Sequence, residues 1–167
     1  GAVFNEASND VDFRVESDDN THMIFVDAGN DKLGIGTSSP STELHLSTST
    51  QGDIVTFEST DAGAATGPNL LLYRNSSSPA DDDNIGAIRF RGRNDNSQDV
   101  DYAEIESFID DVSDGTEDGG LAFRTMGGGT SAERMRIDPN GNIAIGNNNP
   151  ADDTPSIGFQ FDVSSST

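Results

Sequence analysis

Apolar and polar residues alternate with a period of two in almost every apolar run of this 167-residue chain. Such alternation is typical of a β-strand with one apolar and one polar face. No window keeps an apolar period of about 3.6 residues, so we expect almost no helix. The runs that predict strands are Leu44–Leu46, Ile54–Glu58, Ile88–Arg91, Ala103–Phe108, Leu121–Arg124, Met135–Ile137 and Phe159–Val163. The sequence therefore predicts an all-β protein.

Two segments of 28 residues, 110 positions apart, share the same pattern of residues. Residues 13–40 and 123–150 both begin with Phe-Arg, continue through a strand-like run and a Gly/Asn turn, and end in Pro. Each copy contains an apolar-small-Ile-Gly tetrad, at residues 33–36 and 143–146. The turn Asp138–Gly141 of the second copy has Pro where φ is fixed and Gly where φ must be positive. An internal repeat of this size sets the architecture of a chain.

The repeat divides the chain into three predicted parts. Residues 1–47 form an N-terminal repeat unit, residues 48–122 a middle β section with exposed loops, and residues 123–167 a C-terminal repeat unit. One such unit cannot bury its apolar face alone, and in fibrous assemblies the same unit of another chain commonly covers it. The repeat therefore favours a structural module over an enzyme.

The low apolar content points to a core that several chains share. Leu, Ile, Val and Phe account for 35 of the 167 residues, and the formal net charge is -21 at pH 7. This composition is close to that of disordered chains. The regular alternation of apolar and polar residues, however, is not typical of a disordered chain. A small apolar content in each chain is commonly offset by oligomerisation. The tetrads supply the residues that we predict at an oligomer interface, which are Leu33, Ile35, Gly36, Ile143, Ile145 and Gly146.

The charge balance and the short apolar runs argue against two classes of binding partner, nucleic acids and membranes. Thirty acidic residues against nine basic ones argue against nucleic acid, because phosphate binding needs a basic face. No apolar run approaches the roughly 18 residues of a membrane span, so we expect no membrane insertion. Eight of the nine basic residues are Arg. They either pair with carboxylates between strands or chains, or are solvated at the surface.

Acidic loops are the candidate metal sites. Calcium binds six to eight oxygen ligands of the kind that Asp and Asn supply. None of the loops has the spacing of a known calcium loop, so we expect turn carboxylates and no cofactor. Calcium held at the axis of an oligomer is the alternative. The loops are Asp18–Asn20, Asp81–Asn84, Asn94–Asp101 and Asp110–Asp111.

The two histidines, His22 and His45, have no partner at a ligand-like or catalytic spacing. His45 lies between Leu44 and Leu46, so we expect its side chain on the polar face of a strand. We predict a functional role for neither histidine.

Glu104 and Glu106 are the candidate catalytic pair. They are expected on one face of a strand, close enough to act together in glycoside hydrolysis. The chain has no Trp and two Tyr, whereas grooves that cleave sugars commonly offer aromatic platforms. We therefore expect solvated carboxylates and no enzyme.

The segment Leu33–Leu46 (LGIGTSSPSTELHL) resembles the GIGT-x-x-P-x-x-x-L-H-V segments of bacteriophage tail fibres and tailspikes. Residues 133–146 (ERMRIDPNGNIAIG) are similar to the ERMRI-D-x-x-G-N-V-G-I-G segment of the same proteins. The middle of the chain also fits, at Asn84–Phe90, Tyr102–Ile105 and Gly119–Phe123. The resemblance covers most of the chain through short motifs.

This resemblance implies an elongated, intertwined homotrimeric β fibre module, of the β-prism or triple β-helix kind, with a β-rich middle section. It also implies a virion location, other tail proteins as partners, and loops that attach to a host-surface glycan or protein receptor through avidity. Two alternatives stay open. One is a segment of a microbial extracellular filament or adhesin, and the other is a polysaccharide-degrading tailspike fragment that uses Glu104 and Glu106.

Overall fold

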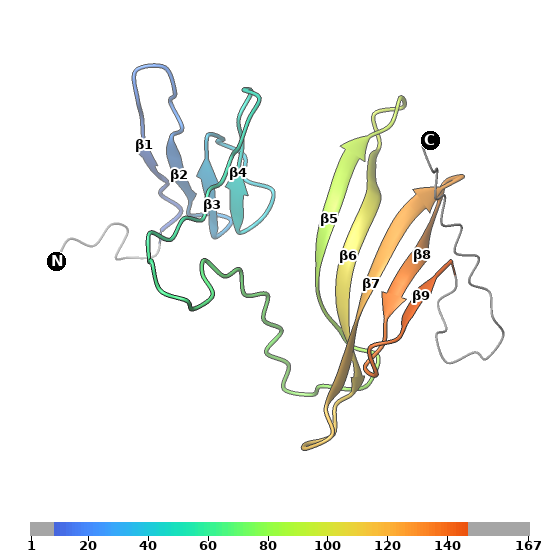
Figure 1. The fold of residues 1–167 in the computed structure, drawn as a ribbon. Coiled ribbons are helices and arrows are strands. Elements are labelled where there is room, and N and C mark those ends of the chain that lie inside the picture. The colour runs from blue at the N-terminus through green and yellow to red at the C-terminus, as the bar shows by residue number, and fades with distance from the viewer. Residues whose placement is uncertain (1–8, 147–167) are drawn as a thin grey trace, which may run out of the picture. The chain divides into compact units, whose positions relative to one another are not determined.

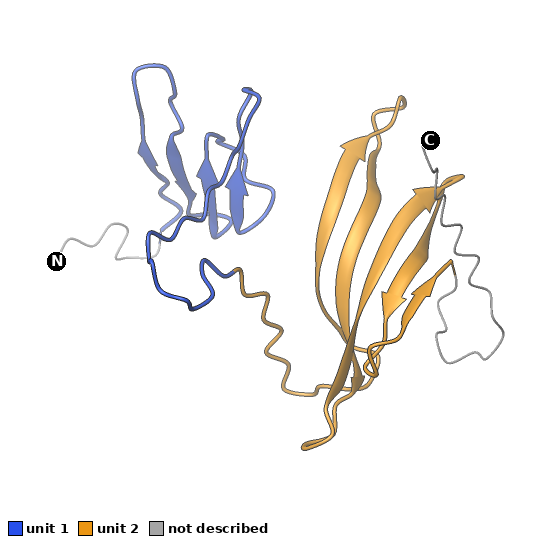
Figure 2. Ribbon diagram, in the orientation of Figure 1, with its two compact units in different colours: residues 1–69 blue, residues 70–167 orange. Residues whose placement is uncertain are grey.

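A computed structural model describes residues 9–146 of the chain. In this range the protein has nine β-strands and no helix, which confirms the predicted all-β fold (Figure 1). The chain divides into two compact units, residues 1–69 and 70–167, and each unit contains one sheet (Figure 2). We describe each unit by itself.

The first unit is a four-stranded sheet with the order β1-β2-β3-β4. Neighbouring strands are antiparallel except β3 and β4, which are parallel. The connection from β3 to β4 runs through residues 36–43. The strands are β1 (Phe13–Val15), β2 (Ile24–Asp27), β3 (Lys32–Ile35) and β4 (Leu44–Leu46).

The second unit is a five-stranded antiparallel meander in which each strand pairs with the next one along the chain. This sheet joins residues on both sides of position 122, where the sequence analysis placed a boundary. The division into three repeat-based parts stays a prediction. The strands are β5 (Asn84–Arg93), β6 (Asp99–Asp111), β7 (Asp118–Gly127), β8 (Thr130–Ile137) and β9 (Ile143–Ile145).

The sequence repeat has a counterpart in backbone pairing. The hairpins β2–β3 and β8–β9 each pair the apolar residue that precedes an Asp with the first residue of the tetrad, although the turn of the second hairpin is one residue shorter. The paired residues are Val26–Leu33 and Phe25–Gly34 in the first hairpin, and Ile137–Ile143 and Arg136–Ala144 in the second. The two tetrads therefore occupy equivalent positions in their sheets.

Both hairpins end at a glycine. Gly36 and Gly146 have positive φ angles of 75° and 80°, which a glycine adopts without steric cost. Each donates its N–H across the hairpin, Gly36 to the carbonyl of His22 at 2.9 Å and Gly146 to that of Arg134 at 2.8 Å. The bond of Gly146 continues the register of β8–β9, whereas that of Gly36 reaches one residue past Met23, which the β2–β3 register places opposite it.

The predicted turn Asp138–Gly141 is confirmed. Gly141 has a φ of 81° and donates its N–H to the carbonyl of Asp138 at 3.0 Å. The side-chain amide of Asn142 donates to the carboxylate of Asp138 at 2.9 Å. In the first hairpin the side-chain amide of Asn30 binds the carboxylate of Asp27 in a similar way, at 3.0 Å. An Asp that accepts from a nearby Asn thus closes both turns.

The predicted strand Ile54–Glu58 is wrong, because no strand forms there in the structure. Its apolar side chains are exposed, with Ile54 at 57%, Val55 at 48% and Phe57 at 63%. Alternation marks a strand only where a neighbouring strand accepts its hydrogen bonds, and this segment has no such neighbour among residues 9–146. The predicted strand Phe159–Val163 lies outside the described residues.

Few side chains are buried in the described part of the chain. The apolar residues with less than a tenth of their surface exposed are Phe25, Phe108, Ala122 and Ala144. Phe108 lies opposite Gly120 in the sheet, and the guanidinium carbon of Arg136 lies 4.2 Å from the centre of its ring. Since globular domains bury most of their large apolar side chains, the location of the remaining ones decides what the molecule can do.

Candidate interaction surfaces

The first sheet has one face that is entirely apolar. Residues paired across neighbouring strands project to the same side of a sheet, so the register assigns each side chain to a face. The opposite face carries Arg14, Phe25, Gly34 and His45. We define the first apolar face by the residues Phe13, Val15, Ile24, Val26, Leu33, Ile35, Leu44 and Leu46.

This first apolar face remains accessible. Six of its eight side chains are 37% to 55% exposed, and Leu33 and Leu46 are half-buried. Antiparallel sheets commonly pack one face on a core and leave the other in water. Here the face with the composition of a core faces solvent. Complete burial of a fully exposed side chain of this size contributes about 1.5–3 kcal/mol, and these side chains can gain only the share that is still exposed. Because six of them lie on one face, covering it still favours association.

The second sheet repeats this arrangement on a larger scale. One row of apolar side chains crosses all five strands, and the next row adds Leu121, Ile137 and Ile143. Ile88, Ile143 and Ile145 are each close to half exposed. We define the second apolar face by these two rows and by Phe90 and Ala103. The first row consists of Ile88, Ile105, Phe123, Met135 and Ile145.

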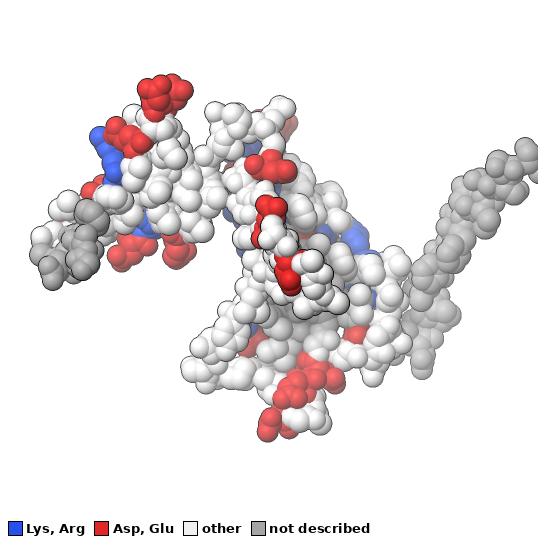
Figure 3. All heavy atoms as spheres, turned by 60° about the vertical axis from the view of Figure 1, so that its left-hand side comes forward, with Lys and Arg blue, Asp and Glu red and all other residues white. Residues whose placement is uncertain are grey.

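The opposite face of the second sheet is charged, and its charges are paired between strands. This confirms the inter-strand pairing that was one of the two interpretations of the Arg excess. On the face of the molecule shown in Figure 3, acidic side chains gather in separate groups on a mostly uncharged surface. The pairs between strands are Arg89–Glu104 at 2.8 Å, Arg91–Asp101 at 2.6 Å, Arg93–Asp99 at 3.3 Å, Arg124–Glu106 at 3.2 Å and Arg124–Glu133 at 3.8 Å.

The predicted interface residues lie at the apolar faces. Leu33 and Ile35 belong to the first apolar face, and Ile143 and Ile145 to the second. Gly36 and Gly146 follow these strands directly. Their role in an oligomer stays a prediction. Sequence reasoning missed the row from Ile88 to Met135, although the alternation within each strand was the signal for it.

Glu104 and Glu106 project from β6 to the same, charged face, as predicted, but the expectation that their carboxylates are solvated is wrong. Each carboxylate is mostly buried, with 16% and 14% of its side chain exposed, and each binds a guanidinium of a neighbouring strand. Glu104 accepts from Arg89, and Glu106 accepts from Arg124. In this geometry both carboxylates stabilise strand pairing.

The acidic loops use their carboxylates to close turns. Asp81 accepts from the backbone N–H of Val112 at 3.0 Å, and Asp111 accepts from that of Ser113 at 2.8 Å. Asp83 forms an ion pair with Arg74 at 3.0 Å. Within residues 9–146, no three ligand-type side chains gather in a way that could hold a metal ion.

The histidines take part in local contacts. The ring of His22 meets the ring of Phe25 edge-on, with 5.4 Å between the ring centres. His45 lies opposite Gly34, on the face away from Leu44 and Leu46, as the sequence predicted.

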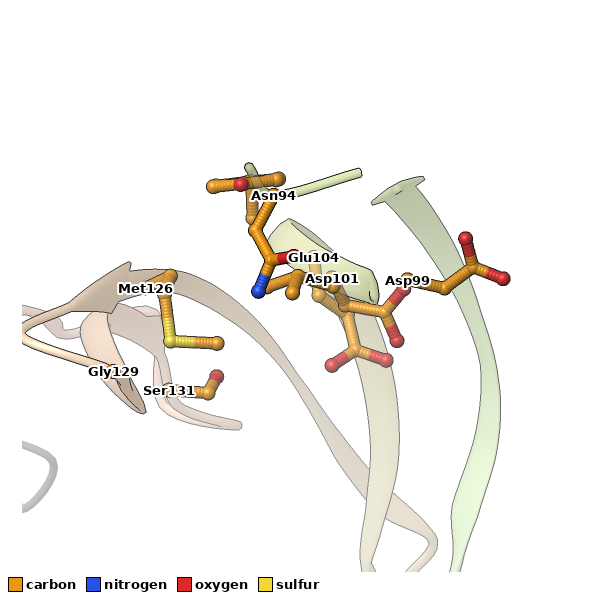
Figure 4. A pocket seen from close by; sticks show the side chains of 9 residues that line it. Asn94, Asp99, Asp101, Glu104, Met126, Gly129 and Ser131 are labelled. Carbon is orange, nitrogen blue, oxygen red and sulfur yellow. The ribbon is translucent and has the colours of Figure 1, made fainter. Parts of the chain in front are cut away.

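A pocket of about 670 Å³ lies where the tips of the β5–β6 and β7–β8 hairpins approach each other (Figure 4). Its polar groups are already engaged. Asp101 binds Arg91 through both oxygens, and Asn94 accepts from the backbone N–H groups of Asn96 and Gln98. The pocket therefore offers few free groups to a ligand.

No protein-family model matches the sequence, and no curated protein sequence is significantly similar to it. None of the described residues belongs to a helix that is long and apolar enough to cross a membrane. The two apolar faces are thus the features on which a functional proposal rests.

Three partly exposed carboxylates predict a loss of stability in acid. The guanidinium of Arg91 holds the pKa of Asp101 below its ordinary value of 3.8. Hydrogen bonds from Ser113 and Asn142 likewise lower the pKa of Asp111 and Asp138. The unfolded chain therefore binds more protons near pH 3.8, and these contributions to stability are lost as the pH falls through and below that value.

We expect the midpoint temperature of thermal unfolding to decrease when the pH is lowered from 5 to 3. The decrease should be smaller in the variant Asp101→Asn/Asp138→Asn. Protonation also relieves the repulsion of a highly acidic chain, so the comparison between variants isolates the lost hydrogen bonds. Asp95→Asn, at an exposed position between β5 and β6, is the control. Identical pH profiles for all three proteins would contradict this assignment.

Proposed function

We propose that the chain is a structural, self-associating β protein, which forms a homotrimeric fibre module of a virion appendage. The observation that carries this proposal is that both sheets expose an apolar face. A single chain has few buried apolar side chains among its described residues, so association supplies the missing core. The symmetry and the virion location rest on the resemblance to tail-fibre segments.

Several features favour a second copy as the partner. Both repeats present equivalent tetrads on apolar faces, and a symmetric oligomer brings the same patch of each copy together. On the second sheet, cross-strand ion pairs neutralise most charges of the opposite face, and this face suits contact with water. In the proposed assembly the apolar faces of both sheets therefore lie in the interior, and the charged face of the second sheet lies on the outside.

The role that fits such a module is attachment by repeated weak contacts. In this proposal the hairpin tips and the segment between the two sheets are presented to a glycan or protein receptor in several copies. Other tail proteins hold the module on the virion. Linked copies bind more tightly than single ones without any new contact, because later binding events become intramolecular.

A microbial extracellular filament is the second candidate. The observation that favours it is the equivalence of the β2–β3 and β8–β9 hairpins, one in each unit. If the first unit of one chain contacts the second unit of the next chain, the contacts run end to end and do not close into a ring. Contacts of this kind generate open fibres. A measurement of the molar-mass distribution distinguishes the two, because a closed trimer has a single mass and open fibres have a series of masses.

Retention on an array of immobilised bacterial surface polysaccharides tests the attachment role. We expect the wild-type chain to be retained on at least one polysaccharide about 10²–10⁴-fold more strongly than a chain held monomeric by a carboxylate on each apolar face. The monomeric variant, Val26→Glu/Ile88→Glu, leaves the hairpin tips unchanged. Equal retention of the two proteins, or no retention of either, would contradict attachment to surface polysaccharides.

A further inference from the structure

The connection between β4 and β5 contains the most exposed large apolar side chains of the described chain. Residues 47–83 form no strand (Figure 1). Leu71 is 81% exposed, Tyr73 74% and Leu70 64%, and each of these values exceeds those of the two apolar faces. Single exposed apolar residues are normal, whereas a contiguous group of them marks an interaction surface. We call residues 70–74 the arm.

The arm is attached to the start of β5. The guanidinium of Arg74 donates to the carbonyl oxygen of Asn84 at 2.9 Å and forms the ion pair with Asp83 at 3.0 Å. A methyl group added at Gly86 would lie 3.3 Å from Cβ of Leu72, so the Leu72 side chain packs directly on this strand. These contacts fix the arm to the sheet of its own unit.

The arm lies at one end of the second apolar face. Side chains alternate along β5, so Gly86 is on the same side of the sheet as Ile88, and Leu72 extends the apolar face at this point. Leu72 is 45% exposed, and its neighbours Leu71 and Tyr73 are far more exposed than that. These two side chains make little contact with their own sheet and are available to another molecule.

Charge favours a second copy of the chain as that molecule. The formal net charge is -21, so two copies repel each other least where neither contacting surface is charged. Residues 70–73 carry no charge, and the second apolar face consists of uncharged side chains. The same acidic balance argues against a membrane surface, because the lipids that attract peripheral proteins are themselves negatively charged.

We propose that the arm joins neighbouring copies. Leu72 packs on β5 of its own chain, and Leu71 and Tyr73 pack on the second apolar face of another copy. This inference rests on the proposed self-association and adds the contact through which one chain reaches the next. Large aromatic side chains such as Tyr are enriched at the centres of interfaces. The polar residues 75–79 that follow the arm stay on the outside, where the proposed attachment uses them.

Tyrosine fluorescence tests whether another copy covers the arm. The chain has no Trp and two Tyr, so Tyr102→Phe leaves Tyr73 as the reporter. We expect acrylamide to quench Tyr73 at least about threefold less in this assembled protein than after Val26→Glu/Ile88→Glu is added, since an interface core excludes water. In the matched control, Tyr73→Phe/Tyr102→Phe/Ser77→Tyr, the reporter lies in the exposed polar loop and should be quenched equally in both states.

Replacing the two exposed side chains provides a second readout. Leu71→Gln/Tyr73→Gln should weaken association about tenfold or more, because a few apolar and aromatic side chains dominate the binding energy of an interface. Both side chains are largely in water in the single chain, so the fold of each unit should not change. Ser77→Gln/Ser78→Gln is the matched control. Sedimentation velocity over a series of protein concentrations measures the association.

The possible results distinguish this inference from the proposed self-association. If the wild-type chain assembles but Tyr73 is quenched as strongly as in the monomeric variant, the arm contact is wrong and the self-association stands. If Leu71→Gln/Tyr73→Gln associates normally but is no longer retained on bacterial polysaccharides, the arm contacts a receptor and the inference is wrong. A monomeric wild-type chain would overturn both proposals.

Discussion

Placing one carboxylate on each apolar face is expected to convert the assembly into monomers. In the single chain Val26 is 39% exposed and Ile88 is 47% exposed, so Val26→Glu/Ile88→Glu leaves both new carboxylates in water. In an assembly that buries these faces, each carboxylate loses its hydration without a partner. Leaving a buried charge unpaired costs about 3–5 kcal/mol, which corresponds to about a thousandfold weaker association for each site.

The control for this experiment has the same change in net charge on the opposite faces. Lys32 and Arg93 project away from the two apolar faces, so Lys32→Gln/Arg93→Gln lowers the net charge by the same amount. The Arg93–Asp99 pair that it removes is exposed on both sides, with 70% and 61% of the two side chains accessible, and contributes little. Sedimentation velocity measures the mass of both variants, and circular dichroism verifies that they remain β-rich. If both variants kept the wild-type mass, the apolar faces would not be the contact.

The largest expected effect on the stability of the fold comes from Gly120→Ala. A methyl group at this position would lie 2.8 Å from the carbonyl oxygen of Ile137 and would collide with the ring of Phe108. Phe108 is 6% exposed, and its ring is held between Gly120 and the guanidinium of Arg136. We expect a loss of about 2–4 kcal/mol, since the substitution overpacks one of the few buried sites or expels its aromatic ring.

Gly92→Ala in the neighbouring hairpin is the matched control for Gly120→Ala. Its new methyl group would lie 3.3 Å from the ring edge of Tyr102, which is exposed and free to move. Phe108→Leu/Gly120→Ala should recover part of the loss relative to Phe108→Leu alone, because the smaller side chain makes room for the methyl group. Chemical denaturation at one protomer concentration measures these differences. A midpoint for Gly120→Ala equal to that of Gly92→Ala would contradict this packing.

Local patterns in the sequence predicted much of the fold. The alternation at Ile88–Arg91 and at Ala103–Phe108 lies within β5 and β6, and the turn at Asp138–Gly141 forms as predicted. These features depend on residues close together in the chain, so the sequence specifies them directly. The segment Ile54–Glu58 has the same local pattern but forms no strand, because pairing depends on a neighbour that the pattern does not reveal.

The interaction surfaces were harder to predict for the same reason. Each strand indicated which of its own side chains share a face, but not which residue lies opposite on the next strand. The row from Ile88 to Ile145 depends on four registers and on bulges such as the one between Phe90 and Arg91. The excess of Arg likewise indicated ion pairs without identifying Glu104 or Asp101 as the partners. Register is a property of the assembled sheet, and it determines the extent of each apolar face.

The molar mass of the purified chain tests the central claim most directly. Light scattering at micromolar concentration, with and without a calcium chelator, should give three times the chain mass of 17.6 kDa in both conditions. Such a result would show that the chains associate as proposed and that calcium is not required for the assembly. A folded monomer in both conditions would contradict the shared core, and with it the proposal of a trimeric β fibre module.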